Sequence, residues 1–316
     1  MSDQTHPHDQ HRSTPRPGGT ATLGGRTVAR IGYGAMALER FADDRQAGVA
    51  LLHRARELGV DHIDTADFYG HSLSNDVIRR AFGTSDDVTV ASKVGAVRVA
   101  AEDSLVLAQR PEQLRAQVHA NLRSLGRERI DVVNLRRADT GPGLVAEGDQ
   151  IVDLDDQLAE MTAMRYEGLI GGIGLSAVST AVLERGLTAG IVCVQNAYSL
   201  VARQDEALLE RCVANGIAWV PFFPLGGAFP GLPKVADEPA VVRIAADLGV
   251  TPAQVGLAWL LAHAPHVLVI PGTSSIGHLA ENVAVGSIEL DAEQTAELDA
   301  VWEHRVADQP GRPPRP

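Results

Sequence analysis

The chain has 316 residues, of which 45% are hydrophobic and 4% aromatic, enough for one large α/β domain or two small ones. Its formal net charge of −12 and its isoelectric point near 5.3 argue against a nucleic acid or an anionic membrane surface as a partner. No apolar run reaches the ~18 residues that a membrane-spanning helix needs, and no secretory signal is visible. We therefore expect a soluble cytoplasmic protein in which Cys193 and Cys212 are buried reduced thiols.

Both ends of the chain have the composition of loose tails. Residues 1–19 are polar and include three histidines and three prolines, and residues 306–316 carry four prolines. We expect a disordered polar tail over 1–19, a folded domain over 20–305 and a proline-rich C-terminal tail over 306–316.

Between the tails, strands alternate with helices along the chain. A short hairpin over 20–29, turning at Gly24-Gly25, comes first. The predicted core strands are 30–34, the first half of 61–70, 88–92, 130–135, 169–174, 191–195, 217–222 and 267–270. The predicted helices are 43–58, 75–82, 111–125, 151–166, 180–187, 205–215, 240–248, 252–263, 277–285 and 292–304.

This alternation predicts an α/β protein with parallel strands. Eight strand–helix units predict a closed (β/α)8 TIM barrel with a short N-terminal hairpin and added C-terminal helices. An open doubly wound sheet is the alternative, and it normally shows an early G-x-G-x-x-G turn. The nearest match, Gly32-Tyr33-Gly34, lacks the third glycine, so the barrel is favoured.

Polar side chains stand where the predicted strands end, which is where barrels of this kind build their sites. Asp64 ends one strand, Tyr69 follows it by five residues, and Lys93 ends the next strand. A free tyrosine titrates near 10, and a neighbouring ammonium favours its phenolate, while a carboxylate keeps that ammonium charged. The three residues can form a proton-donating unit. Taken singly, Asp64 could cap a loop, Tyr69 could pack in the core and Lys93 could lie on the surface.

Seven motifs in order resemble the aldo-keto reductase family across residues 20–305. They are IDTADFYG (63–70), ASKVG (91–95), IDVVNLRRAD (130–139), GLIGGIGLS (168–176), VQNAY (194–198), PFFPLG (221–226) and IPGTSSIGHLAEN (270–282). Within the family, VVNLR, VCVQN, VPFFPLGG and IPGTSS are most similar to the bacterial pyridoxal reductases. The resemblance implies NADPH-dependent reduction of an aldehyde or ketone to an alcohol, with a pyridoxal-like aldehyde favoured and no metal.

The resemblance also implies residue roles. Tyr69 would be the general acid, Lys93 would lower its pKa, and Asp64 would anchor Lys93. Gln195 and Ser176 would bind the nicotinamide carboxamide, and Phe222 would stack on the ring where the family usually has a tyrosine. The remaining cofactor-binding positions are Leu225, Gly226 and Gly227 with Lys234 at the pyrophosphate, and Gly272, Thr273, Ser274, His278, Glu281 and Asn282 at the adenosine end with its 2′-phosphate.

Three departures from the family pattern bear on function. Arg136 occupies the place of the usual catalytic histidine, and it could polarise a carbonyl, bind an anionic substrate group or pair with an acid. Ala177 replaces an asparagine that helps to hold the carboxamide, which puts more weight on Gln195. The 2′-phosphate region has His278 and hydroxyls but no clear arginine, so NADP(H) is the expected cofactor with NAD(H) possible.

Three other functions fit parts of the sequence. The first is a reductase of a secondary-metabolite or xenobiotic carbonyl. The second is a non-catalytic, nicotinamide-binding regulatory barrel, which Arg136 favours and the retained Asp64, Tyr69 and Lys93 oppose. The third is an aldolase-like barrel in which Lys93 forms a Schiff base. The family resemblance implies a small carbonyl compound as substrate. The sequence leaves the physiological substrate and the oligomeric state open.

Overall fold

The fold was analysed in a computed structural model, which describes residues 15–99, 103–137, 139, 144–227 and 231–307. Most of both predicted tails, 1–14 and 308–316, lies outside the described residues. Within them, the predicted N-terminal hairpin is present as β1 (Thr20–Leu23) and β2 (Arg26–Ala29), which pair antiparallel.

The centre of the molecule is a curled parallel sheet in the order β11-β10-β9-β8-β5-β4-β3. Its strands are β3 (Tyr33–Gly34), β4 (His62–Asp64), β5 (Thr89–Val94), β8 (Ile130–Arg136), β9 (Ile170–Ser176), β10 (Ile191–Gln195) and β11 (Ala218–Trp219). Parallel bridges from Val269 to Ile31 and from Val267 to Trp219 join the two edges of this sheet. The predicted barrel is therefore confirmed, and its eighth strand is present as two bridges rather than as a continuous ladder.

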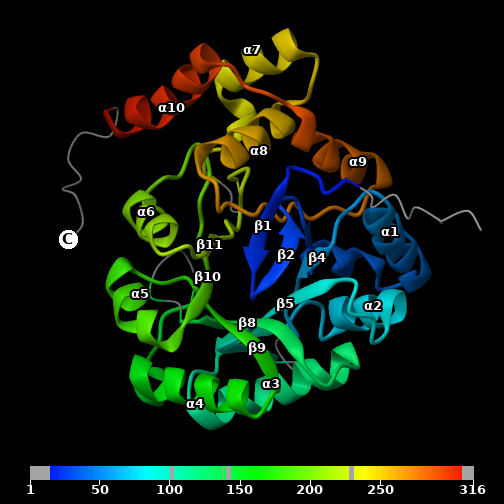
Figure 1. The fold of residues 1–316 in the computed structure, drawn as a ribbon, viewed down its shortest axis with the longest axis vertical. Helices are drawn as coiled ribbons and strands as arrows, with labels where there is room; N and C mark the ends of the chain where they lie inside the picture. The colour runs from blue at the N-terminus through cyan, green and yellow to red at the C-terminus, as the bar shows by residue number, and fades with distance from the viewer. Residues whose placement is uncertain (1–14, 100–102, 138, 140–143, 228–230, 308–316) are drawn as a thin grey trace, which may run out of the picture.

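Helices surround the sheet in a ring, and Figure 1 looks along the axis of that ring. The helices are α1 (Arg45–Glu57), α2 (Leu73–Phe82), α3 (Pro111–Leu125), α4 (Leu154–Tyr166), α5 (Thr180–Gly186), α6 (Glu206–Ala214), α7 (Pro239–Leu248), α8 (Pro252–His263), α9 (Ile276–Ala284) and α10 (Ala292–Ala307). Of these, α7 and α10 lie outside α8, away from the sheet (Figure 1). Local signals set several of their starts. Proline occupies the first turn of α3, α7 and α8, where its missing N–H has no intrahelical partner to lose.

Two local features differ from the sequence-based expectation. Soon after β5, the strands β6 (Ala96–Val99) and β7 (Ser104–Leu107) pair antiparallel as a second hairpin. The strand expected over 217–222 is shorter, because only Ala218 and Trp219 belong to β11. Pro221 has no N–H to give to a ladder, and the chain beyond it returns to the sheet at one bridge, from Phe222 to Ala197.

The β1–β2 hairpin closes one end of the barrel. Its Leu23 and Val28 pack against alternate residues of the barrel strands, and in Figure 1 the hairpin lies over the middle of the ring. The barrel residues in this cluster are Ala91, Val132, Cys193, Ala218, Val220, Leu268 and Ile270. At the turn, a Cβ on Gly24 would come within 2.5 Å of Val132 Cγ2, so the close approach requires glycine. A site of any size must therefore open at the opposite end, where the strands finish.

A polar cluster joins helix α6 to helix α8. Glu206 on α6 accepts hydrogen bonds from Tyr198 Oη (2.6 Å) and Arg203 Nε (2.8 Å), and it also contacts His263 Nε2 of α8 (2.7 Å). Burial alone would raise the Glu206 pKa, but these partners outweigh it and hold the pKa near 2.

Among the described residues no single helix is long and apolar enough to cross a membrane. The helices α7 and α8 would be so only together, and they meet at 97°. The expectation for the cysteines is confirmed, since Cys193 and Cys212 are both free and buried, and burial raises the pKa of Cys212 to about 12.

Gly174→Ala should destabilise the barrel. The new Cβ would overlap Asn134 Oδ1 and lie 2.6 Å from Cys193 Sγ inside the barrel. Overpacking of this kind lowers the free energy of unfolding by about 2 kcal/mol. Urea unfolding followed by circular dichroism measures it. Gly186→Ala is the matched control, since its new Cβ meets nothing closer than 3.4 Å. An equal loss of stability in both variants would contradict the close packing around Gly174 inside the barrel.

Glu206→Gln should lower the free energy of unfolding at neutral pH and make it depend less on pH in the acid range. A carboxylate whose folded pKa is lowered to about 2 stabilises the fold above its ordinary pKa of 4.5, and this stability is lost as the pH falls towards 2. Urea midpoints of the two proteins should therefore differ most at pH 7, and the difference should shrink as the pH falls from 4.5 towards 2. A constant difference across that range would refute the assignment. Glu184→Gln, which removes an exposed carboxylate paired with Arg211, serves as the control and should change little.

Candidate active site

A buried ion pair lies where β4 and β5 end. Lys93 Nζ donates to Asp64 Oδ1 and also to the backbone oxygen of Thr65 (3.0 Å). The two charged side chains are only 7% and 6% exposed. Burial alone would lower the Lys93 pKa, but the carboxylate of Asp64 and the phenol oxygen of Tyr69 outweigh it, so the pKa lies above its ordinary value. Lys93 is therefore an ammonium at neutral pH.

Gln195 completes the surroundings of the ion pair. Gln195 Nε2, at the end of β10, donates to Asp64 Oδ2 at 2.6 Å, so both oxygens of the carboxylate are engaged. Its Oε1 is buried and has no hydrogen-bond partner among the described residues. A buried acceptor without a partner can accept a hydrogen bond from the N–H of a bound group, such as a carboxamide.

Tyr69 lies against the ammonium, in the loop between β4 and α2. Lys93 Nζ is 5.1 Å from the centroid of the Tyr69 ring, and Phe68 meets that ring edge-on at 5.2 Å. Burial raises the Tyr69 pKa, and the charge of Lys93 lowers it, with a net value above the ordinary one. The expected effect of Lys93 is present, but it only offsets burial, so the hydroxyl keeps its proton at neutral pH.

The end of β8 adds a second cation. Arg136 pairs in register with Ser176 at the end of β9, and Ser176 pairs in turn with Gln195. These three residues therefore stand side by side at the ends of neighbouring strands. Burial lowers the Arg136 pKa, and the electrostatic influence of Tyr69 raises it.

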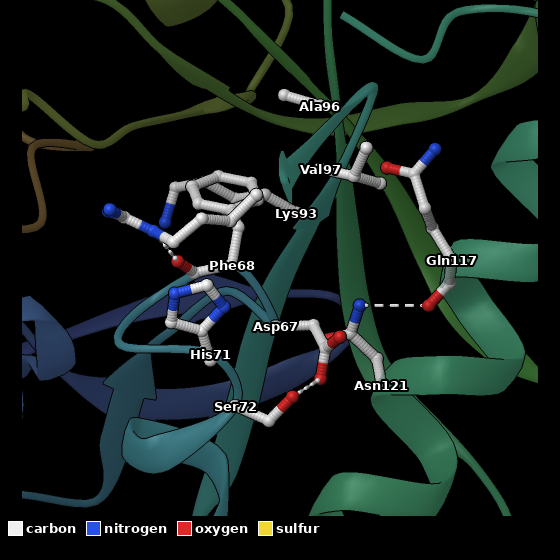
Figure 2. A pocket seen from close by; sticks show the side chains of 10 residues that line it. Asp67, Phe68, His71, Ser72, Lys93, Ala96, Val97, Gln117 and Asn121 are labelled. Atoms are coloured by element: carbon white, nitrogen blue, oxygen red, sulfur yellow. Dashed lines mark hydrogen bonds between the residues drawn. The ribbon is translucent and has the colours of Figure 1, made fainter. Parts of the chain in front are cut away.

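A cavity of about 190 Å³ adjoins Lys93 on the side of α2, α3 and the second hairpin. Figure 2 shows its labelled side chains, with Phe68 and Lys93 on one side and Gln117 and Asn121 of α3 on the other. The full lining is Asp67, Phe68, His71, Ser72, Lys93, Ala96, Val97, Arg98, Gln117 and Asn121. Arg98 was not predicted to line a cavity, because no sequence motif indicates the β6–β7 hairpin that carries it.

The segment after β11 holds the predicted cofactor positions Phe222, Leu225, Gly226 and Gly227, with Lys234. Phe222 packs edge-on against Phe223 at 5.1 Å between ring centroids. Gly226 and Gly227 both have left-handed backbone, with φ of 67° and 65°, and Gly226 bridges Lys234. The side chain of Lys234 covers Gly227, where an added Cβ would lie 2.6 Å from Lys234 Cγ.

The remaining predicted positions follow the eighth strand. Tyr33 Oη donates to the backbone oxygen of Thr273 at 2.6 Å, and a Cβ on Gly272 would come within 2.6 Å of the Gly34 oxygen. Ser274 lies one residue before the N-cap of α9, and Ser275 Oγ accepts from the His278 N–H at 3.4 Å. The predicted side chains of α9 are exposed or partly exposed, namely His278, Glu281 and Asn282.

Helix α8 holds these two segments together. Gln254 Nε2 donates to the Glu281 oxygen of α9 at 3.0 Å. A Cβ on Gly256 would lie 3.2 Å from Leu225 Cδ2, so Leu225 packs on the same helix. The glycine loop and α9 thus both contact one helix. Free backbone N–H groups at a helix N-terminus bind phosphate oxygens, so this region fits a nucleotide.

Comparison with known proteins agrees with this architecture. The sequence pattern of the Aldo/keto reductase family matches residues 30–303. The chain belongs to the aldo/keto reductase family. It is 44% identical over 291 residues to pyridoxine 4-dehydrogenase of Escherichia coli, covering 89% of this chain and 98% of that protein. It is 35% identical over 288 residues to an uncharacterised oxidoreductase of Schizosaccharomyces pombe, covering 89% of each.

Solved structures show the same fold for this aldo/keto reductase. An aldo-keto reductase of Klebsiella pneumoniae, crystallised in complex with NADPH, superimposes with a TM-score of 0.74 at 26% identity, covering 90% of this chain and 94% of that one. An aldo-keto reductase of Bacillus halodurans in its holo form gives 0.72 at 22% identity, covering 89% and 95%. At that identity the second comparison supports the fold alone.

Lys93→Met should destabilise the protein strongly, because it leaves the buried carboxylate of Asp64 without its cation. Breaking a buried pair in this way lowers the free energy of unfolding by about 3–5 kcal/mol. The double variant Lys93→Met/Asp64→Asn should recover part of the loss, since the uncompensated charge is gone. Urea unfolding at pH 7 measures both. Arg54→Met, which breaks an exposed pair with Glu57, should change stability by less than about 1 kcal/mol. A similar loss in the Lys93 and Arg54 variants would contradict the burial argument.

Proposed function

We propose that the protein reduces an aldehyde or ketone to an alcohol with NADP(H), and that a pyridoxal-like aldehyde is the favoured substrate. The observation that carries the proposal is the contact of Lys93 with both Asp64 and Tyr69 at the open end of the barrel. Membership of the aldo/keto reductase family and the relationship to pyridoxine 4-dehydrogenase of E. coli support it.

The chain offers groups that suit a nicotinamide dinucleotide. The unpaired Gln195 Oε1 would accept from the carboxamide, with Ser176 beside it, and Phe222 would pack against the ring. Leu225 and the left-handed Gly226 and Gly227 would border the pyrophosphate. Residues 272–275 and the first turn of α9 would hold the adenosine end, with Ser274 and His278 at the 2′-phosphate and Glu281 and Asn282 one turn further on. When bound, the nicotinamide supplies the hydride. The NADPH-bound aldo-keto reductase of Klebsiella pneumoniae supports this assignment.

Tyr69 would deliver the proton to the carbonyl oxygen. Its raised pKa means that the hydroxyl carries a proton at neutral pH, which a general acid requires. As the proton leaves, the phenolate that forms is stabilised by the ammonium of Lys93, 5.1 Å from the ring centroid. Burial makes this charge interaction stronger than it would be in water.

Asp64 and Gln195 would keep the ammonium in place. The carboxylate accepts from Lys93 on one oxygen and from Gln195 on the other, which limits its rotation. Gln195 would therefore serve the ion pair through Nε2 and the cofactor through Oε1. In this arrangement the position of Lys93 depends on the same glutamine that meets the nicotinamide.

A Schiff-base role for Lys93 is disfavoured by its surroundings. A nucleophilic amine must be neutral, whereas the carboxylate of Asp64 and the phenol oxygen of Tyr69 keep the Lys93 pKa above its ordinary value. A regulatory barrel without turnover remains the competing proposal from a different class, because Arg136 replaces the usual histidine.

A steady-state screen separates these functions. Aldehydes including pyridoxal are offered with NADPH and with NADH in parallel, and cofactor oxidation is followed by absorbance. Oxidation of NADPH with an aldehyde supports the reductase. Tight NADPH binding without oxidation by any carbonyl compound would favour the regulatory barrel, and the ratio of the two cofactors' kcat/KM values tests the 2′-phosphate assignment.

Tyr69→Phe should lower kcat by about 100- to 10,000-fold, the range for loss of a general acid. The Kd of NADPH, measured by fluorescence titration, should stay nearly unchanged, because the hydroxyl is assigned to the substrate. Retained turnover would remove Tyr69 from its assigned role. Tyr166→Phe is the control, since Tyr166 is 85% exposed on α4 and its loss should leave kcat as it was.

A further inference from the structure

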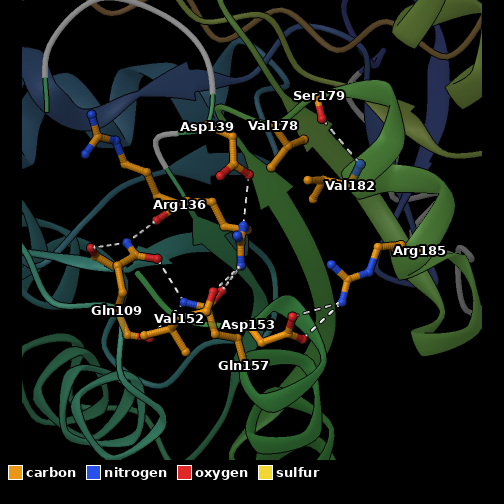
Figure 3. A network of polar contacts seen from close by, with 12 residues as sticks. Gln109, Arg136, Asp139, Val152, Asp153, Gln157, Val178, Ser179, Val182 and Arg185 are labelled. Atoms are coloured by element: carbon orange, nitrogen blue, oxygen red, sulfur yellow. Dashed lines mark hydrogen bonds and ion pairs between the residues drawn. The ribbon is translucent and has the colours of Figure 1, made fainter. Parts of the chain in front are cut away.

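Two consecutive arginines at the end of β8 have different surroundings. Arg137 Nε donates to Asp139 at 2.8 Å, and its Nη1 donates to the Val152 oxygen at 3.3 Å and to Gln157 Oε1. The guanidinium of Arg136 has no acidic partner within 4.0 Å in the described part of the chain, and its Nη1 is buried without a hydrogen-bond partner. In Figure 3 the Arg136 side chain extends away from the polar network that engages its neighbour.

The backbone fixes where this cation stands. The oxygen of Arg136 accepts from Gln109 Nε2 at 2.7 Å, and Gln109 is held by Gln157 Nε2 at 2.9 Å. A Cβ on Gly95 would overlap the same Arg136 oxygen, so that glycine, with φ of 105°, lets the chain pass close by. The strand end is therefore rigid, while its guanidinium is left available.

A partly buried charge without a counter-ion is unfavourable unless an anion neutralises it during the working cycle. The fork of a guanidinium matches two adjacent oxygens and carries its charge at every working pH. β8, which ends in Arg136, is the neighbour in the sheet of β5, which carries Lys93, and the Tyr69 ring lies against Lys93. An oxygen that receives a proton from Tyr69 would therefore lie in the same region as Arg136.

Resting on the proposed function, we propose that Arg136 is a specificity-determining residue that selects carbonyl substrates with an ionised oxygen beside the carbonyl, such as 2-hydroxyaryl aldehydes in their phenolate form. The guanidinium would bind the phenolate oxygen, while the neighbouring carbonyl oxygen would face Tyr69. Hydride from NADPH goes to the carbonyl carbon, the proton from Tyr69 goes to the carbonyl oxygen, and the phenolate leaves unchanged on the alcohol. The histidine usual at this position could not supply a fixed charge in this way.

The test compares 2-hydroxybenzaldehyde, which ionises, with 2-methoxybenzaldehyde, which has the same shape around the carbonyl but cannot ionise. In Arg136→Gln, kcat/KM for the hydroxy compound should fall about 10- to 100-fold, the range for a hydrogen bond to a charged group. The methoxy compound should lose less than about 3-fold, and the Kd of NADPH should not change. Arg136→Lys should fall between, because it keeps the charge without the fork.

Arg137→Gln is the matched control, since Arg137 is paired with Asp139 and should leave the hydroxy-to-methoxy ratio of kcat/KM unchanged. In the wild type, the same ratio should rise with pH as the phenol ionises, and this rise should be lost in Arg136→Gln. An equal loss for both aldehydes, no loss for either, or weaker NADPH binding would each overturn the proposal. A wild-type enzyme that oxidises NADPH with no aldehyde at all would instead refute the proposed function.

Discussion

The buried pair of Asp64 and Lys93 is the interaction on which the site depends. Two full charges in a poorly hydrated place are tolerated only when each is compensated, and here the carboxylate has two donors and the ammonium has a carboxylate and a carbonyl oxygen. This compensation keeps Lys93 positive despite burial. This positive charge lowers the Tyr69 pKa, in opposition to the burial that raises it.

The barrel makes that pair possible by bringing strand ends together. β4 and β5 are neighbours in the sheet, whereas β10 lies further round the ring, yet its Gln195 reaches the same carboxylate. The hairpin β1–β2 seals the opposite end with Leu23 and Val28, so the polar residues gather where the barrel opens. Helix α8 contacts both Leu225 and α9, so the two proposed nucleotide-binding segments meet on one helix.

The contrast between Arg136 and Arg137 follows from the geometry of a strand. Side chains alternate between the two faces of a sheet, so consecutive residues at the end of β8 point in opposite directions. Arg137 meets Asp139 and Gln157, whereas Arg136 stays on the side of Tyr69 without an acid among the residues described. Arg137 belongs to a structural ion pair, whereas the charge of Arg136 is not compensated by an acid among the described residues. The residue type alone does not distinguish two consecutive arginines in this way.

Sequence alone determined the number and order of the strand–helix units, because hydrophobic periodicity is a local property. Motifs likewise sufficed to bring Asp64, Tyr69 and Lys93 to successive strand ends. The tertiary structure decided what depends on contacts between distant residues. Gln195 engages Asp64 from 131 residues away, the eighth strand is reduced to two bridges, and the second hairpin forms a cavity wall beside Lys93. The direction of the Tyr69 pKa also belongs here, since burial is a property of the whole fold and no spacing along the chain can weigh it against one lysine.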